Sequence, residues 1–273
     1  MSTSKHAGAR ITVRDFRDRK DRGEKLVVVT AYDALFGKLV DESGVDAVLV
    51  GDSVGNLLAG YETTLPVTLD QMVYHARSTR AGVKRALLIV DMPFLTYQVS
   101  PARALLNCGR VMAEGGADAV KLEGASDSVL AAVRAVTGAG IPVMGHLGFT
   151  PQSVNTLGGT RVQARDDASA KKIVDDAKKL EDAGAFSIVL ELLPANVAAR
   201  VTAAVGIPTI GIGAGAQCSG QVLVLHDLLG LNEGFSPKFL KRYAEMAAEV
   251  REAIARFGSD VRAGSYPDDD HSF

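Results

Sequence analysis

The stretch GADAVKLEGA, residues 116–125, is one of the repeated strand units that decide the fold, and it places two charges inside an apolar strand. It follows a helix-like segment and has the composition of a buried β-strand, yet Lys121 and Glu123 lie within it. Side chains two residues apart on a strand point to the same face. We therefore expect Lys121 and Glu123 to point together into a polar cavity at the end of this strand.

Seven other segments share the short, apolar, β-branched character of this one. The eight strand candidates alternate with longer helix-like segments and cover residues 25–30, 45–52, 85–92, 118–124, 141–148, 186–192, 207–215 and 220–227. Strands that are apolar on both faces and are joined by helices are typical of parallel sheets, and eight such units predict an α/β fold with a single closed (β/α)8 TIM barrel. The alternative is an open doubly wound sheet. Its dinucleotide-binding form requires a glycine-rich turn after an early strand, whereas residues 31–38 read AYDALFGK.

Two helices are expected outside the eight units. Residues 11–23 carry Thr12 and, three positions later, Asp15, a capping-box variant that predicts a short N-terminal helix closing the barrel bottom. Residues 236–258 begin with Ser-Pro, keep a helical apolar period and end at glycine, which predicts a long amphipathic C-terminal helix. We expect a flexible N-terminus over residues 1–10, one barrel domain over 11–258 and a flexible acidic tail over 259–273.

Composition excludes several classes of partner. The 273 residues are 47% hydrophobic and 23% charged, as in a globular domain, and the formal net charge is -2. Without a long basic run, neither a nucleic acid nor an anionic membrane is an expected partner. No apolar run reaches the roughly 18 residues of a membrane span, and the N-terminus lacks a signal-peptide pattern, which predicts a cytoplasmic protein. Cys108 and Cys218 form no metal motif and are expected to be inert packing residues.

Four carboxylates stand at the C-terminal ends of strand candidates: Asp52, Asp91, Glu123 and Glu191. In a barrel these ends form the face that carries catalytic residues. One acid at such a position often caps a helix or lies in a solvated loop, and for Asp52 that alternative is competitive. Four aligned acids favour a site.

The carboxylates suggest a metal and a base. Neighbouring strands lie about 4.8 Å apart, so Asp52, Asp91 and Glu123 on consecutive strands can converge on one cation. Ligands that are all oxygen favour Mg²⁺. Glu191, further round the barrel, can remove the proton next to a metal-bound carbonyl while the metal stabilises the enolate.

Three features have two interpretations each. Lys121 binds a substrate carboxylate or pairs with Glu123 or Asp91, and we favour the former because buried pairs stabilise little. His146, also at a strand end, is compatible with a core role or with a place in the site. The loop GIGAGAQCSG, residues 211–220, forms a phosphate site or a closely packed turn, and the absence of Lys and Arg between residues 201 and 237 favours the turn.

Long motifs resemble those of the ketopantoate hydroxymethyltransferase family from Ile11 to about Phe257. They are TAYDALFGKLVDESGVDAVLVGDSVGNLLAGYETTLPVTLDQMVYH, DMPF, AVKLEG, GHLGFTPQSVN and IGIGAGAQCSGQVLVLHDLLG. The resemblance implies a (β/α)8 barrel of the phosphoenolpyruvate mutase and isocitrate lyase type. It also implies Mg²⁺-dependent transfer of the hydroxymethyl unit of 5,10-methylenetetrahydrofolate to α-ketoisovalerate, giving ketopantoate for pantothenate and coenzyme A.

Roles follow from the matching motifs. The resemblance implies that Asp52 in VGDS and Asp91 in VDMP bind both metal and substrate, with Glu123 in KLEG completing the metal shell directly or through water. Ser53 and Lys121 would hold the keto-acid carboxylate. Glu191 in LELLP would be the proton acceptor, and His146 is an additional site residue to be tested. The resemblance further implies a homodecamer of two pentameric rings.

Two other functions stay open. One is a C–C or C–P bond lyase or mutase of the related superfamily, whose members carry a catalytic cysteine in a KxCGH-like loop. No such string occurs in this sequence. The other is a non-catalytic barrel that binds a metabolite.

Overall fold

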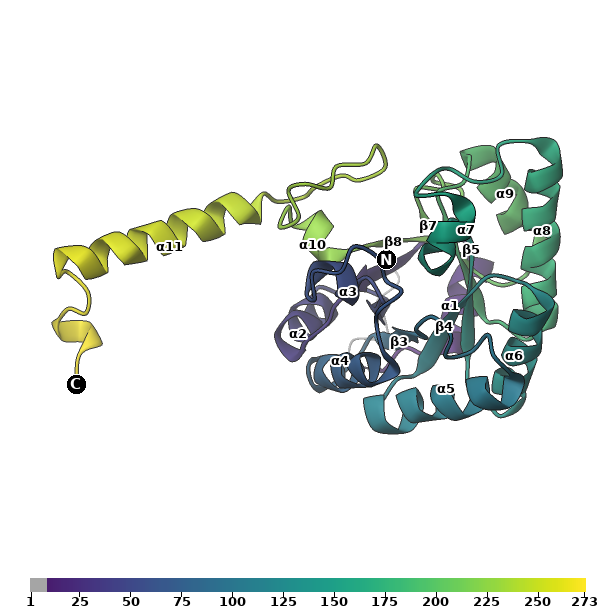
Figure 1. Ribbon diagram of the computed structural model, residues 1–273, viewed down its shortest axis with the longest axis horizontal. Coiled ribbons are helices and arrows are strands. Elements are labelled where there is room, and N and C mark those ends of the chain that lie inside the picture. The colour runs from purple at the N-terminus through teal and green to yellow at the C-terminus, as the bar shows by residue number, and fades with distance from the viewer. Residues whose placement is uncertain (1–8) are drawn as a thin grey trace. The chain divides into compact units, whose positions relative to one another are not determined.

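The computed structural model describes residues 9–273 and divides the chain into two compact units, with the division after Leu223. In the first unit all eight predicted strands form, and they close into one parallel barrel in the order β1 to β8, with β8 pairing with β1 (Figure 1). The predicted (β/α)8 barrel is therefore confirmed. The strands are β1 (Leu26–Thr30), β2 (Ala47–Val50), β3 (Leu87–Asp91), β4 (Ala119–Glu123), β5 (Val143–Gly148), β6 (Ser187–Glu191), β7 (Thr209–Ile212) and β8 (Gly220–Leu223).

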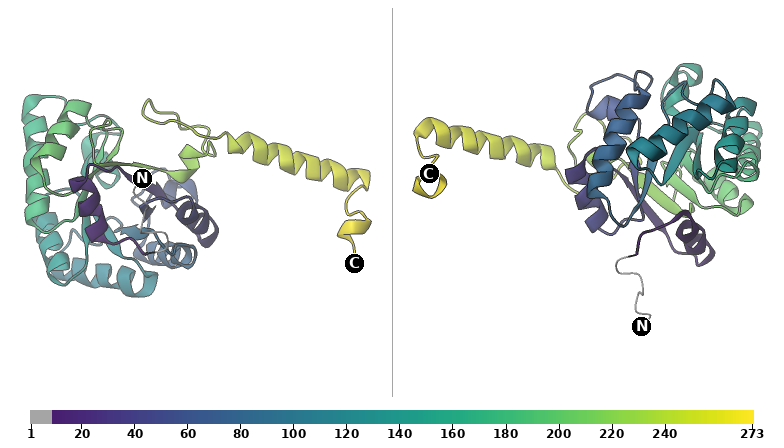
Figure 2. Two further views of the ribbon diagram at one scale, coloured as in Figure 1. Left: turned by 180° about the vertical axis from the view of Figure 1, so that it is seen from behind. Right: turned by 90° about the horizontal axis from the view of Figure 1, so that it is seen from below.

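Helices surround the barrel, and most begin with an ordinary N-cap. Ser100 caps α5 and Ser126 caps α6 by accepting a backbone N–H, as expected for serine at this position. Figures 1 and 2 show the longer helices of this unit outside the strands. The helices of the first unit are α1 (Val13–Asp21), α2 (Ala34–Glu42), α3 (Val54–Leu57), α4 (Leu69–Gly82), α5 (Pro101–Gly115), α6 (Asp127–Gly138), the 3-10 turn η1 (Pro151–Ser153), α7 (Val154–Leu157), α8 (Asp167–Asp182) and α9 (Ala195–Ala204).

An apolar cluster fills the N-terminal half of the barrel. Leu26, Leu87, Ile89 and Met144 are at most 2% exposed, and Phe16 of α1 packs into the same cluster with no exposure. The predicted capping box of α1 is present between Thr12 and Asp15. These contacts confirm that α1 closes the barrel bottom, which leaves the opposite end for polar side chains.

Lys20, on the same helix, anchors α1 to the end of α9 and to the loop before β7. Its ammonium donates hydrogen bonds to the carbonyl oxygens of Thr202, Val205 and Ile207, at 3.2, 2.6 and 2.8 Å. An ammonium with three donors is thereby satisfied by three carbonyls at the barrel bottom.

Two predicted elements have wrong boundaries. The last strand was expected to run to residue 227, but β8 ends at Leu223 and a short helix, α10 (Leu225–Leu228), follows. The C-terminal helix was expected over 236–258, but α11 spans Met246–Ala263, and a 3-10 turn, η2 (Asp269–His271), follows it. Arg242 is one reason for the late start, because its guanidinium donates to the carbonyls of Asn232, Glu233 and Phe235 and so stabilises an irregular segment on both sides of the Ser-Pro signal.

The observed end of α11 also changes the bounds of the predicted C-terminal tail. The first five residues of the expected tail, 259–263, belong to α11, which ends at Gly264 in the left-handed conformation. Residues 1–8 of the expected flexible N-terminus lie outside the described residues. The mobility of both termini stays a prediction. Within residues 9–273, no helix combines the length and apolar character needed to cross a bilayer.

Candidate active site

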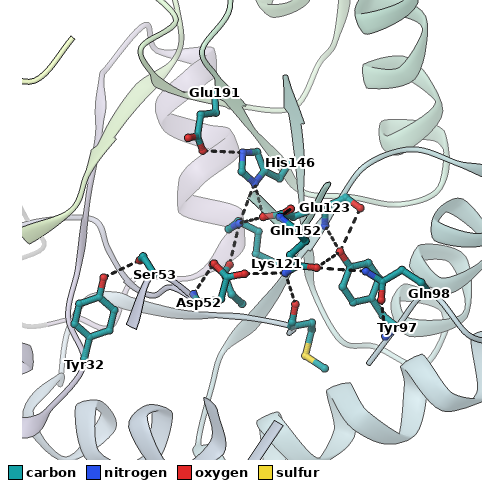
Figure 3. Close-up of polar contacts among 12 residues, drawn as sticks. Tyr32, Asp52, Ser53, Tyr97, Gln98, Lys121, Glu123, His146, Gln152 and Glu191 are labelled. Carbon is teal, nitrogen blue, oxygen red and sulfur yellow. Dashed lines mark hydrogen bonds and ion pairs between the residues drawn. The ribbon is translucent and has the colours of Figure 1, made fainter. Parts of the chain in front are cut away.

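Strand pairing brings the predicted acids to one end of the barrel. In the register of the sheet, Asp91 pairs with Lys121, Glu123 pairs with His146, and Glu191 pairs with Gly148. Asp52 lies two residues after the end of β2. The carboxyl ends of parallel strands share one edge, so these side chains meet at the barrel mouth (Figure 3).

A buried ion pair forms the centre of the site. Lys121 Nζ lies 3.0 Å from Asp91 Oδ1 and 3.9 Å from Glu123 Oε1, and the three side chains are at most 5% exposed. The Asp52 backbone N–H donates to Asp91 Oδ2 at 3.0 Å. The structure therefore contains the Lys121–Asp91 pair that the sequence left as an alternative, and the role of Lys121 toward a substrate carboxylate stays a prediction.

The electrostatics of this centre are dominated by excess negative charge. Burial, followed by Asp91 and Glu123, raises the pKa of Asp52 to about 8. Burial also raises the pKa of Glu123 to about 7, with Asp91 adding to the shift and Lys121 opposing it. Burial lowers the pKa of Lys121, but the three carboxylates outweigh burial and raise it above its ordinary value. Three carboxylates facing one ammonium favour a further cation.

Gln152 connects the carboxylates and was missed by the sequence reasoning. It lies in the 3-10 turn after β5, where its side-chain Nε2 donates to Asp52 Oδ2 at 2.9 Å and its backbone N–H donates to Glu123 Oε2 at 3.0 Å. The buried Tyr97 hydroxyl donates to Gln152 Oε1 at 2.8 Å and accepts the Glu123 backbone N–H at 3.0 Å. Gln152 falls inside the GHLGFTPQSVN motif, which was the available signal, whereas nothing near Tyr97 indicated a role.

Glu191 lies across the mouth and joins the centre through His146. His146 Nε2 lies 3.1 Å from Glu191 Oε2, and His146 Nδ1 lies 3.1 Å from Lys121 Nζ (Figure 3). His146 is 2% exposed, whereas the Glu191 side chain is 18% exposed. Burial and the Lys121 ammonium lower the pKa of His146, although Glu191 opposes this shift. Of the two interpretations of His146, the structure supports a place beside the site residues.

Ser53 begins the short helix α3 directly after Asp52. Its Oγ lies 2.8 Å from the hydroxyl of Tyr32, which follows β1 and which the sequence reasoning also missed. A Cβ on Gly51 would come within 2.8 Å of Ser53 Oγ and 3.5 Å of Asp91 Oδ2. A Cβ at residue 51 would therefore displace the Ser53 hydroxyl from its present position.

The donor set fits a magnesium ion held by few protein ligands. Among the described residues, no group of three or more His, Cys, Asp or Glu side chains is arranged as a metal site. Mg²⁺ commonly uses one or two carboxylates and fills its shell with water and substrate oxygens. Asp91 Oδ1 and Glu123 Oε1 are buried without an aligned hydrogen bond, and together with Asp52 they supply hard oxygens.

The glycine-rich loop after β7 is accounted for by packing. Gly215 has φ +81°, and a Cβ there would lie 2.6 Å from Ala195 Cβ. A Cβ on Gly220 would lie 2.4 Å from the carbonyl oxygen of Leu26, where β8 meets β1. These contacts support the closely packed turn. Both cysteines are buried, as expected, and burial raises the pKa of Cys108 to about 12.

Comparison with known proteins agrees with this arrangement. The model of the family described as ketopantoate hydroxymethyltransferase matches residues 10–269. The chain belongs to the ketopantoate hydroxymethyltransferase family. It is 50% identical over 262 residues to the 3-methyl-2-oxobutanoate hydroxymethyltransferase of Clostridium botulinum (strain Alaska E43 / Type E3), covering 96% of this chain and 95% of the relative. It is also 50% identical to the enzyme of that name from Syntrophus aciditrophicus (strain SB), over 100% of both chains.

Solved structures agree with the barrel type. A 2,3-dimethylmalate lyase, described as a member of the PEP mutase/isocitrate lyase superfamily, superposes with a TM-score of 0.62. The superposition covers 92% of this chain and 86% of that one at 16% identity. At this identity the likeness shows the fold alone. The barrel of this chain therefore has the same fold as the barrel of that lyase.

Proposed function

We propose that this chain transfers the hydroxymethyl unit of 5,10-methylenetetrahydrofolate to α-ketoisovalerate (3-methyl-2-oxobutanoate) and releases ketopantoate for pantothenate and coenzyme A synthesis. The observation that carries the proposal is the full-length identity of about one half to relatives named for this reaction. The site supports it, because a keto acid requires a cation for its oxygens and a base for its C3 proton, and the barrel mouth offers groups for both.

The cation is proposed to be Mg²⁺, held by Asp52 and Asp91, with Glu123 bound directly or through water. When bound, it polarises the keto group and stabilises the negative charge that develops there. Lys121 and Ser53 would bind the keto-acid carboxylate, and Asp52 and Asp91 would act on the same substrate by holding the cation. Lys121 can do so while keeping its contact with Asp91, because an ammonium has three donors.

Glu191 is the proposed base. Its carboxylate takes the proton from C3, and C3 then forms a bond to the methylene carbon carried by the folate. The two carbon–nitrogen bonds of that methylene to the folate break, and water supplies the new hydroxyl group. The proton from C3 and the remaining proton of the water go to the two folate nitrogens, which releases tetrahydrofolate. Glu191 is partly exposed at the rim, so it can reach a substrate that the buried carboxylates hold from the other side.

The proposal is tested by separating proton removal from bond formation. With Mg²⁺ and no folate in deuterated water, the protein should exchange the C3 hydrogen of α-ketoisovalerate, and adding methylenetetrahydrofolate should yield ketopantoate. Glu191→Gln should lose both activities by a factor on the order of 10² or more, as for removal of a positioned general base. Glu249→Gln, on the exposed face of α11, is the matched control. Exchange at the wild-type rate in Glu191→Gln would move the base elsewhere.

The metal is tested in the same assay. Chelation should stop exchange, and Asp52→Asn should raise the Mg²⁺ concentration needed for half-maximal exchange. Unchanged exchange in Asp52→Asn would refute the metal assignment. A lyase or mutase of the same barrel type would instead cleave its substrate without folate, and a non-catalytic barrel would show neither exchange nor product.

Assembly and location belong to the same proposal. A homodecamer is proposed because the family resemblance implies one, and a cytoplasmic location is proposed because the sequence has no long apolar run and no signal-peptide pattern. Small-molecule substrates, rather than nucleic acid or membrane, are the proposed partners.

A further inference from the structure

His146 stands between the cation-binding half of the site and the proposed base. It lies on β5, next to Glu123 of β4 and Val189 of β6 in the sheet register. Its two ring nitrogens contact opposite sides of the site, with Nδ1 3.1 Å from Lys121 Nζ and Nε2 3.1 Å from Glu191 Oε2 (Figure 3). A ring in this position can contact Lys121 and Glu191 at the same time.

The contact with Lys121 decides which nitrogen carries the proton. An ammonium donates hydrogen bonds and cannot accept them, so Nδ1 of the ring must be the acceptor. The neutral ring then carries its proton on Nε2, the nitrogen that faces Glu191. Glu123 Oε1 also lies 3.3 Å from Nδ1 and could accept a proton from it. A proton on Nδ1 would, however, also face the Lys121 ammonium, and the repulsion between them disfavours that tautomer.

The proton on Nε2 faces the Glu191 carboxylate at 3.1 Å. Within residues 9–273, His146 is the polar side-chain partner of the Glu191 carboxylate. His146 Nε2 is itself buried without an aligned hydrogen bond, so the Glu191 side chain must turn for the two groups to form one. Catalytic hydrogen bonds are commonly long or misaligned before substrate binds. At 18% exposure, an unrestrained Glu191 would be free to turn toward water.

We propose that His146 is the positioning residue of the base: its Nε2–H holds the Glu191 carboxylate in the orientation from which it removes the C3 proton. This inference rests on the proposed function and adds a role that the family motifs do not give. His146 itself does not touch the reacting carbon. Misplacing a catalytic group by about 1 Å can cost on the order of 10² in rate.

Three replacements of His146 distinguish the roles of its two ring nitrogens. His146→Gln can place an amide N–H donor near the position of Nε2, His146→Asn is too short to reach Glu191, and His146→Leu removes both polar contacts. We expect Asn and Leu to slow C3 exchange by about 10- to 100-fold, whereas Gln stays within about fivefold of wild type. The Kd of α-ketoisovalerate should change less than about threefold in all three variants. If the Leu variant does not fold, the two amides still provide the comparison.

A double variant tests whether His146 acts through Glu191. If it does, His146→Leu should not slow the residual exchange of Glu191→Gln any further, because residues that act as a unit are not additive. Three results would each overturn the inference. The first is an equal loss of exchange in His146→Gln and His146→Leu, and the second is a loss of exchange explained by a weaker Kd for α-ketoisovalerate. The third is a further loss when His146→Leu is added to Glu191→Gln. No exchange in the wild-type protein would overturn the proposed function, and the inference with it.

Discussion

Replacing Lys121 by Met tests how far the buried ion pair supports the fold. The change removes the charge that lies 3.0 Å from Asp91 Oδ1 and 3.9 Å from Glu123 Oε1 but keeps most of the side-chain volume. At an effective dielectric constant near 20, a pair at about 4 Å is worth roughly 4 kcal/mol before desolvation is counted. Removing one partner of a buried pair typically lowers the free energy of unfolding by about 3–5 kcal/mol, which we expect here.

The loss should depend on pH. The pKa values of Asp52 and Glu123 are already raised, to about 8 and about 7, and removing Lys121 raises them further. A group whose folded-state pKa lies above its unfolded value stabilises the protein below the unfolded pKa, and this stabilisation is lost as pH rises through the folded pKa. Wild type and variant therefore diverge only where wild type has lost these protons and the variant still holds them, from about pH 7 upward, so the variant should be less impaired at pH 5.5 than at pH 8.

Urea denaturation of metal-free protein at both pH values, at one protein concentration, measures these effects. Lys121→Arg is the control that keeps the charge. Added Mg²⁺ should recover part of the loss in Lys121→Met, because a cation replaces the missing positive charge. A loss below about 1 kcal/mol, or an equal loss at the two pH values, would refute the electrostatic reasoning. Normal binding of α-ketoisovalerate by a destabilised Lys121→Met would restrict Lys121 to the structural pair.

Other predictions address the scaffold and the assembly. Asp41→Asn should lower the unfolding free energy by about 2 kcal/mol at pH 7 in urea denaturation, because the carboxylate accepts the backbone N–H groups of residues 84–86. Burial by itself would raise the pKa of Asp41, yet those hydrogen bonds keep it below its ordinary value. The stabilisation from Asp41 should therefore disappear as pH falls from about 4. A stability difference between wild type and Asp41→Asn that does not change with pH would contradict this reasoning. Gly148→Ala should lower both stability and C3 exchange, since φ is +97° and a Cβ would lie 2.1 Å from the Glu191 carbonyl oxygen. Gly109→Ala, in an open position of α5, should be neutral or stabilising, and similar effects of the two would refute the steric argument. Sedimentation at micromolar concentration should show a decamer, and a stable monomer would exclude it.

The barrel could be predicted because its strands are buried on both faces. Such strands are continuous apolar runs, as in LLIVD of β3, and their alternation with helices leaves few topologies. The errors lie after β8, where the barrel's repeat ends. There the apolar run LVLHDLL continues into α10, and Ser-Pro at 236 precedes a segment that Arg242 stabilises without a helix.

For the site, the sequence alone determined which end of the barrel carries chemistry and which acids stand there, because a side chain's position on a strand follows from the strand's own period of two. Lys121 and Glu123 were predictable for that reason. The tertiary structure alone decided their partners. Gln152 reaches Asp52 across 100 residues of sequence, and the two nitrogens of His146 acquire different roles only because Lys121 and Glu191 lie on the strands to either side. Such contacts depend on register and on loop paths, which no local pattern encodes.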